Sequence, residues 1–124
     1  MRKAIPLVVL ISVAACSFVA RAPDGYRDDM QALLDTRHGA LEQCYDDVLK
    51  SDARAGGKVT VSFRVLKETG AVAEPAVDAS RTTAPEPVQQ CVLRSLDGLV
   101  LDPADRREGQ ATFVWEFESA RTAR

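Results

Sequence analysis

The stretch Lys58-Val59-Thr60-Val61-Ser62-Phe63-Arg64-Val65 decides the fold of this 124-residue chain. Its apolar residues occupy every second position, and the positions between them are polar. Such alternation is typical of a β-strand with one buried face. Residues 67–70 follow with the composition of a turn, and residues 72–79 are predicted to form a second strand. Pro75 lacks a backbone donor, so we expect a bulge or a sheet edge at that point.

A third strand is predicted near the C-terminus, over residues 110–118. Aromatic residues alternate there with polar or small ones, which places all the aromatic side chains on one face of the strand. We expect that face to join the core. The aromatic residues are Phe113, Trp115 and Phe117, and the residues between and beside them are Thr112, Val114 and Glu116.

Two stretches have the periodicity of amphipathic helices. From about Arg27 to Leu49, apolar residues recur at intervals of three and four, which predicts one helix, with Gly39 as a position where it starts or bends. A capping box at Thr83-Ala84-Pro85-Glu86 begins a second helix, which ends at Gly98. The predicted order is helix, strand, strand, helix, strand, which is an α+β fold.

The N-terminus has the layout of a signal peptide. Met1-Arg2-Lys3 is basic, and an apolar run from Ala4 to Ala15 follows that is too short for an ordinary membrane-spanning helix. The segment Val13-Ala14-Ala15-Cys16 resembles the bacterial lipobox, which implies cleavage before Cys16 and lipidation of its thiol. Ser17 in the next position favours the outer membrane by the same resemblance. The alternative is an ordinary secretory signal that is cut after Ala15 or Ala20.

The cysteine count fits an oxidising compartment once Cys16 carries lipid, because Cys44 and Cys91 then remain as a pair. A disulfide between them would stabilise the fold by roughly 4 kcal/mol in the chain-entropy model. Two buried free thiols, or a cysteine contact to another protein, are the alternatives. A metal site is not expected, because His38 and two cysteines are too few ligands.

The predicted organisation is a signal peptide (1–15), a lipidated N-terminus with a short tether (16–26), one folded domain (27–118) and a frayed tail (119–124). Cleavage removes Arg2 and Lys3, which leaves 14 basic against 18 acidic residues. This mildly acidic balance does not favour binding of nucleic acid, because proteins that bind nucleic acid usually present a basic face.

The order of elements and several short motifs resemble the TonB C-terminal superfamily, and more closely its AgmX/PglI-type C-terminal domain. The resemblance covers about His38 to Glu118. It implies a three-stranded antiparallel sheet with two helices on one face, a structural cysteine pair and a periplasmic protein-binding role. The motifs that carry it are Cys44-Tyr45, Gly57-Lys58-Val59-Thr60-Val61-Ser62-Phe63, Gly70-Ala71-Val72 and Cys91-Val92.

The candidate binding surface is an edge of that sheet, because an unpaired edge can accept an extended peptide as an additional strand. By the resemblance, the last strand is the edge that binds, and Thr112, Val114 and Glu116 flank it. The alternative is an edge that is protected by charge and by the tail. The tether of about ten residues, at ~3.5 Å per residue, is too short for transmission of force across the periplasm.

No catalytic motif stands out. Asp46 and Asp47 are adjacent on a predicted helix and so point in different directions. His38 has no nucleophile at an informative spacing, and the chain lacks a Gly-x-Ser-x-Gly elbow and a P-loop. We therefore expect a lipoprotein without enzymatic activity and without a cofactor, which binds envelope proteins at the periplasmic face of the outer membrane. The alternative is a structural or self-associating envelope lipoprotein, for which a homodimer is expected.

Overall fold

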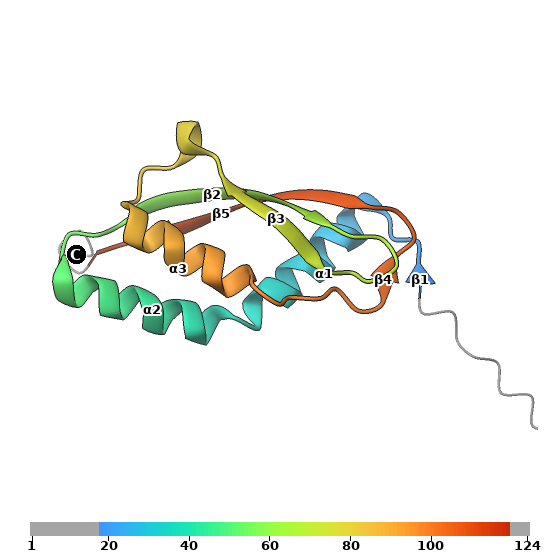
Figure 1. The fold of residues 1–124 in the computed structure, drawn as a ribbon, viewed down its shortest axis with the longest axis horizontal. Helices are drawn as coiled ribbons and strands as arrows, with labels where there is room; N and C mark the ends of the chain where they lie inside the picture. Colours follow the sequence, from blue (N-terminus) through green and yellow to red (C-terminus); the bar gives the residue numbers. More distant parts are fainter. Residues whose placement is uncertain (1–17, 120–124) are drawn as a thin grey trace, which may run out of the picture.

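The computed structural model describes residues 18–119, in which helices and strands form an α+β fold (Figure 1). This confirms the fold class that was expected from the sequence. The elements in chain order are β1 (Phe18–Val19), α1 (Pro23–Asp35), α2 (His38–Ser51), β2 (Gly57–Val65), β3 (Val72–Val77), the short 3-10 helix η1 (Ala79–Arg81), α3 (Glu86–Leu96), β4 (Ala104–Asp105) and β5 (Gly109–Phe117).

The main sheet is antiparallel and has the strand order β3-β2-β5. β2 lies at its centre and pairs with β5 in one continuous register, from Gly57 opposite Phe117 to Val65 opposite Gly109. The pairing of β2 with β3 is less regular, since its register shifts between Ser62 and Arg64. The expected irregularity in the second strand, near Pro75, is thereby confirmed.

The prediction of one uninterrupted helix from Arg27 to Leu49 is wrong, but the expected start or bend near Gly39 is confirmed, since α2 begins at His38. Two helices, α1 and α2, cover this stretch, so the described residues contain three α-helices rather than two. The break lies at Thr36, whose hydroxyl donates to the carbonyl of Leu33 at 2.6 Å. The backbone N–H of Arg37 also bonds three residues back, to Leu34, which tightens the last turn of α1 and ends it.

The predicted capping box before the second helix is also wrong. α3 begins at Glu86, and Pro85 at its N-cap makes no side-chain capping bond. The Thr83 hydroxyl instead accepts a hydrogen bond of 2.9 Å from the backbone N–H of Lys58. The Thr83 hydroxyl, which the local sequence pattern assigned to the helix N-terminus, therefore bonds to strand β2 instead.

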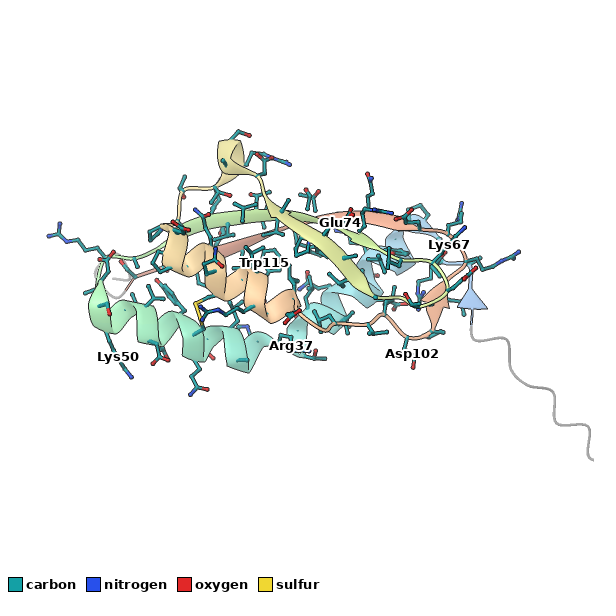
Figure 2. All side chains as sticks on the ribbon, in the orientation of Figure 1. Arg37, Lys50, Lys67, Glu74, Asp102 and Trp115 are labelled. Carbon is teal, nitrogen blue, oxygen red and sulfur yellow. A yellow bond between two sulfur atoms is a disulfide. The ribbon has the colours of Figure 1, made fainter. Side chains whose placement is uncertain are left out.

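The three helices bury their apolar residues against one face of the sheet (Figure 1). Figure 2 shows the side chains that fill the layer between them. Val59, Val61, Phe63 and Val65, at alternate positions of β2, are all nearly inaccessible to solvent. Helix residues that meet them in the core are Met30, Leu34, Leu41, Tyr45, Val88, Cys91, Val92 and Leu96.

The disulfide joins α2 to α3. Cys44 and Cys91 have their sulfur atoms 2.01 Å apart and their Cα atoms 5.7 Å apart, which confirms the predicted pair. The Tyr45 hydroxyl, next in sequence, donates to the carbonyl of Ala55 at 2.6 Å. Its ring also packs against Phe117, with the ring centres 4.8 Å apart, so this end of β5 is held to α2.

The segment expected to be a tether is folded from Phe18 onward. β1 pairs in parallel with β4, and α1 begins at Pro23 rather than near Arg27. Proline suits the first turn of a helix because the N–H it lacks has no partner there. Ser119, which was expected to begin a frayed tail, is buried. The predicted signal peptide, Cys16 and residues 120–124 lie outside the described residues.

Candidate functional site

The two edges of the main sheet differ in their capacity to accept another strand. At the β3 edge, Glu74 has a φ of 54° and Pro75 has no N–H to donate. The first residue of β3, Val72, already donates to the carbonyl of Leu99 at 3.0 Å. The β3 edge is thus interrupted in the middle and occupied at its start.

The β5 edge is regular. Within residues 18–119, β5 pairs only with β2, over nine residues and without a bulge. The strand contains no proline and no lysine or arginine, which are the residues that commonly protect an edge. The β5 edge therefore has the features of a surface that can extend the sheet.

The direction of the backbone groups along β5 follows from hydrogen bonds on the other side of β2. The N–H of Thr60 donates to the Thr82 hydroxyl at 3.0 Å, and its carbonyl accepts from the N–H of Asp78 at 2.8 Å. Thr60 thus turns its backbone away from β5, and in an antiparallel pair this direction alternates along the strand. Its partner Val114 accordingly turns its own N–H and carbonyl toward the open edge.

The same alternation applies along the whole strand. The residues whose N–H and carbonyl groups face the open edge are therefore Gln110, Thr112, Val114 and Glu116. Three of these were singled out from the sequence, and all four side chains are exposed on the sheet face opposite the helices. Val114 is 53% exposed. The Thr112 hydroxyl lies 2.8 Å from that of Ser62 on the same face.

The aromatic residues of β5 lie on the helix side and are half-buried. The ring of Phe113 stacks on that of Phe63 with the centres 6.0 Å apart, and it also meets Trp115 at 6.3 Å. Trp115 is labelled in Figure 2. These residues therefore face the core, as expected, but they pack at its margin and stay partly exposed.

A groove of about 580 Å³ runs between α1 and the first half of β5. Residues of α1 form one wall, and residues 109–113 form the other. Both the outward-facing Thr112 and the helix-side Phe113 line the groove, so it follows the edge of the strand itself. The α1 residues in its wall are Pro23, Tyr26, Arg27 and Met30.

Buried polar residues close one end of the groove. The side chains of Arg21 and Asp105 are 8% and 4% exposed, and their charged atoms lie 3.8 Å apart. Arg21 also pairs with Asp29 at 2.6 Å and donates to the carbonyl of Pro103 at 2.6 Å. Arg21 thus ties α1 and the residues around β4 together at this end.

The environment shifts the pKa values of two groups at this end. Burial raises the pKa of Asp105, but the backbone N–H groups of Arg107 and Arg21 donate to its carboxylate and, with the charges of both arginines, bring the pKa below its ordinary value. Burial, followed by the charge of Asp105, raises the pKa of Tyr26 despite the opposing charge of Arg21. Both groups therefore keep their usual charge near neutral pH.

Arg21, Tyr26 and Asp105 carry no signal in the sequence that marks them as site residues. Arg21 and Tyr26 fell in the expected tether, and Asp105 in an irregular stretch. Contacts across 84 positions leave no periodic signal in the sequence, and the parallel pairing of β1 with β4 brings Arg21 close to Asp105.

Other candidate residues from the sequence do not converge. His38 is exposed and lies 3.9 Å from Glu42, one turn along the same helix. Asp46 and Asp47 are exposed, and Asp47 pairs with Lys50 at 3.1 Å. In the described part of the chain, no cluster of three or more His, Cys, Asp or Glu side chains could hold a metal ion.

Comparison with protein-family models, with curated proteins and with solved structures found no match for the chain. The resemblance to the TonB C-terminal superfamily therefore stays a prediction. Within residues 18–119, no helix is long and apolar enough to cross a membrane.

Proposed function

We propose that this chain is a lipid-anchored protein of the bacterial envelope that binds a partner by strand addition at the β5 edge. The observation that carries the proposal is the contrast between the two sheet edges. β5 offers nine regular residues, whereas β3 is interrupted at Glu74 and Pro75. Strand addition needs an unpaired, regular edge, and β5 meets that requirement.

The binding surface consists mainly of backbone. An added strand would exchange hydrogen bonds with Gln110, Thr112, Val114 and Glu116, whose N–H and carbonyl groups face the open edge. Side chains of the added strand would alternate between the outer face of the sheet and the groove beside α1. Such a surface recognises an extended segment and needs no catalytic group, so we propose a non-enzymatic role.

Site-specific photo-crosslinking tests this proposal. A photoreactive residue at Thr112 or Glu116 should capture the same envelope protein in cells, because both positions lie on the β5 edge. The matched control is Ala76, which is exposed on β3, and it should not capture that protein. Equal capture from Ala76, or none from β5, would contradict the proposal.

The proposed anchor is a diacylglycerol on Cys16, and its support is the lipobox-like segment that ends there. Two or more acyl chains give stable membrane attachment, whereas one chain is marginal. Labelling with radioactive palmitate should mark the wild-type chain and leave Cys16→Ser unlabelled. Fractionation of the cells should then recover the wild-type chain with the outer membrane.

Self-association is the second candidate. Val114 is a large apolar residue, 53% exposed, at an outward-facing position of β5, and a second copy of the chain could cover it. Sedimentation separates the two candidates. A stable dimer whose crosslinks join β5 to β5 would favour a structural or self-associating lipoprotein, and a monomer would favour a partner of another kind.

A further inference from the structure

Two arginines on opposite walls of the β5 groove have no acidic partner. Arg27 on α1 and Arg107, just before β5, are exposed and line the groove. Neither makes an ion pair within residues 18–119. The acidic residues of the groove are already engaged, since Asp105 contacts Arg21 and Glu108 contacts Arg64. Arg27 and Arg107 are therefore exposed and free of ion pairs, although the charge of Arg107 also acts on the nearby Asp105.

Two buried polar atoms of the groove wall have no hydrogen-bond partner among the described residues. These atoms are Arg21 Nη1 and the Tyr26 hydroxyl oxygen. Buried polar atoms are seldom left unpaired in native proteins. Arg21 Nη1 can only donate, so an acceptor oxygen of a ligand would satisfy it, whereas the Tyr26 hydroxyl can donate or accept.

Apolar surface lies beside these charges. Phe113 and Tyr26 are half-buried and line the groove from β5 and from α1, and the exposed Pro23 extends the apolar surface. An apolar side chain that entered here would remove part of this surface from water, which favours binding by roughly 25 cal/mol per Å² buried.

We propose that the groove selects an extended segment of a partner protein with a carboxylate side chain and a large apolar side chain two residues apart. The inference rests on the proposed strand addition. Residues two apart in a strand point to the same side, so both side chains would face α1. The carboxylate would then meet Arg27 or Arg107, and the apolar side chain would cover Phe113 and Tyr26.

The test is fluorescence anisotropy with the purified full chain in mild detergent and short, labelled threonine-rich peptides. The first peptide carries one glutamate and a leucine two residues further on. The second has lysine in place of glutamate, and the third places the leucine next to the glutamate. We expect the first peptide to bind about fivefold to tenfold more tightly than either of the others, because the second loses a partly exposed ion pair and the third loses the apolar contact with Phe113 and Tyr26.

Protein variants assign the preference to the groove. R27E and R107E should each weaken binding of the glutamate peptide and strengthen binding of the lysine peptide. The matched control is R54E, which makes the same charge change at an exposed arginine outside the groove. It should leave both affinities unchanged. Circular dichroism of every variant confirms that the chain is folded.

The outcomes separate this inference from the proposed function. Equal binding of the three peptides would overturn the acidic and apolar preference and leave strand addition intact. Binding that R54E alters as much as R27E would overturn the placement of the carboxylate in the groove. If no peptide binds to the folded chain, strand addition itself is overturned, and the preference with it.

Discussion

The backbone N–H of Arg21 donates a hydrogen bond of 2.9 Å to the carboxylate of Asp105, 84 positions further along the chain. Both side chains are more than nine-tenths buried. The contact fixes the residues before α1 to β4 and so closes one end of the β5 groove. Arg21, five positions after the proposed lipid anchor Cys16, thus forms part of the candidate binding site.

Asp105→Asn should destabilise the protein by about 1–3 kcal/mol at neutral pH, because it leaves the buried Arg21 with a weaker partner. Urea unfolding followed by circular dichroism measures the change. Asp28→Asn is the matched control, since Asp28 is an exposed carboxylate on α1 without an ion pair among the described residues. An equal loss in both variants would show that the buried contact has no particular role.

The acid stability should depend on the same carboxylate. The pKa of Asp105 is lower in the folded protein than its ordinary value, so the unfolded chain binds the proton more tightly. The ionised Asp105 therefore contributes fully to the free energy of unfolding above about pH 4, and this contribution is lost as the pH falls through the folded-state pKa. Urea midpoints between neutral pH and pH ~3 should fall more steeply for the wild type than for Asp105→Asn. Parallel curves would contradict this prediction.

The disulfide should contribute a large part of the stability of so small a domain. Cys44 and Cys91 are 47 positions apart, and a cross-link over such a loop stabilises by about 4 kcal/mol in the chain-entropy model. The double variant Cys44→Ala/Cys91→Ala should unfold at much lower urea concentration. Mass spectrometry of the non-reduced protein should identify the linked pair, and free thiols at both positions would rule out the cross-link.

Proline should act differently at two neighbouring positions of β5. At Val114 it would remove an N–H that faces the open edge, so Val114→Pro should fold and lose partner binding. At Trp115 it would remove a hydrogen bond to β2, so Trp115→Pro should unfold the domain or cost about 3 kcal/mol or more. Thermal unfolding and the crosslinking assay measure both effects. Similar stability of the two variants would contradict the assigned backbone directions.

Two glycines should respond in opposite directions to alanine. Gly70 has a φ of 73°, and a Cβ added there would lie 2.0 Å from the carbonyl oxygen of Leu101, so Gly70→Ala should destabilise the protein strongly. Gly39 lies in α2 with nothing within 4 Å of an added Cβ. Gly39→Ala should stabilise the protein by up to about 1 kcal/mol. Denaturant midpoints of the two variants provide the comparison.

Much of the strand structure could be predicted because its signals are local. The alternation in residues 58–65 arises from one buried and one polar face, and the same holds for residues 110–117. The cysteine pair followed from the count and from the apolar faces on which both cysteines lie. The predicted edge residues Thr112, Val114 and Glu116 are those whose backbone turns outward.

The helix boundaries were harder to predict. Apolar spacing continues from α1 into α2 because both helices cover the same core, so periodicity alone did not reveal the break at Thr36, although Gly39 indicated a start or bend close to it. The break depends on a hydroxyl and two N–H groups that bond to the preceding turn. Likewise, the Thr83 hydroxyl could accept a hydrogen bond from the first turn of a helix or from a neighbouring strand. Only the folded sheet places the N–H of Lys58 within reach of it.

The sequence by itself determined the α+β class and the strands with one buried face, because periodicity acts over short distances, and the cysteine count predicted the pairing of Cys44 with Cys91. Only the tertiary structure decided which sheet edge is open, and only it formed the groove between α1 and β5. Both depend on contacts between residues far apart in the chain, such as Arg21 with Asp105. These contacts exist only once packing brings the segments together, so no local pattern records them.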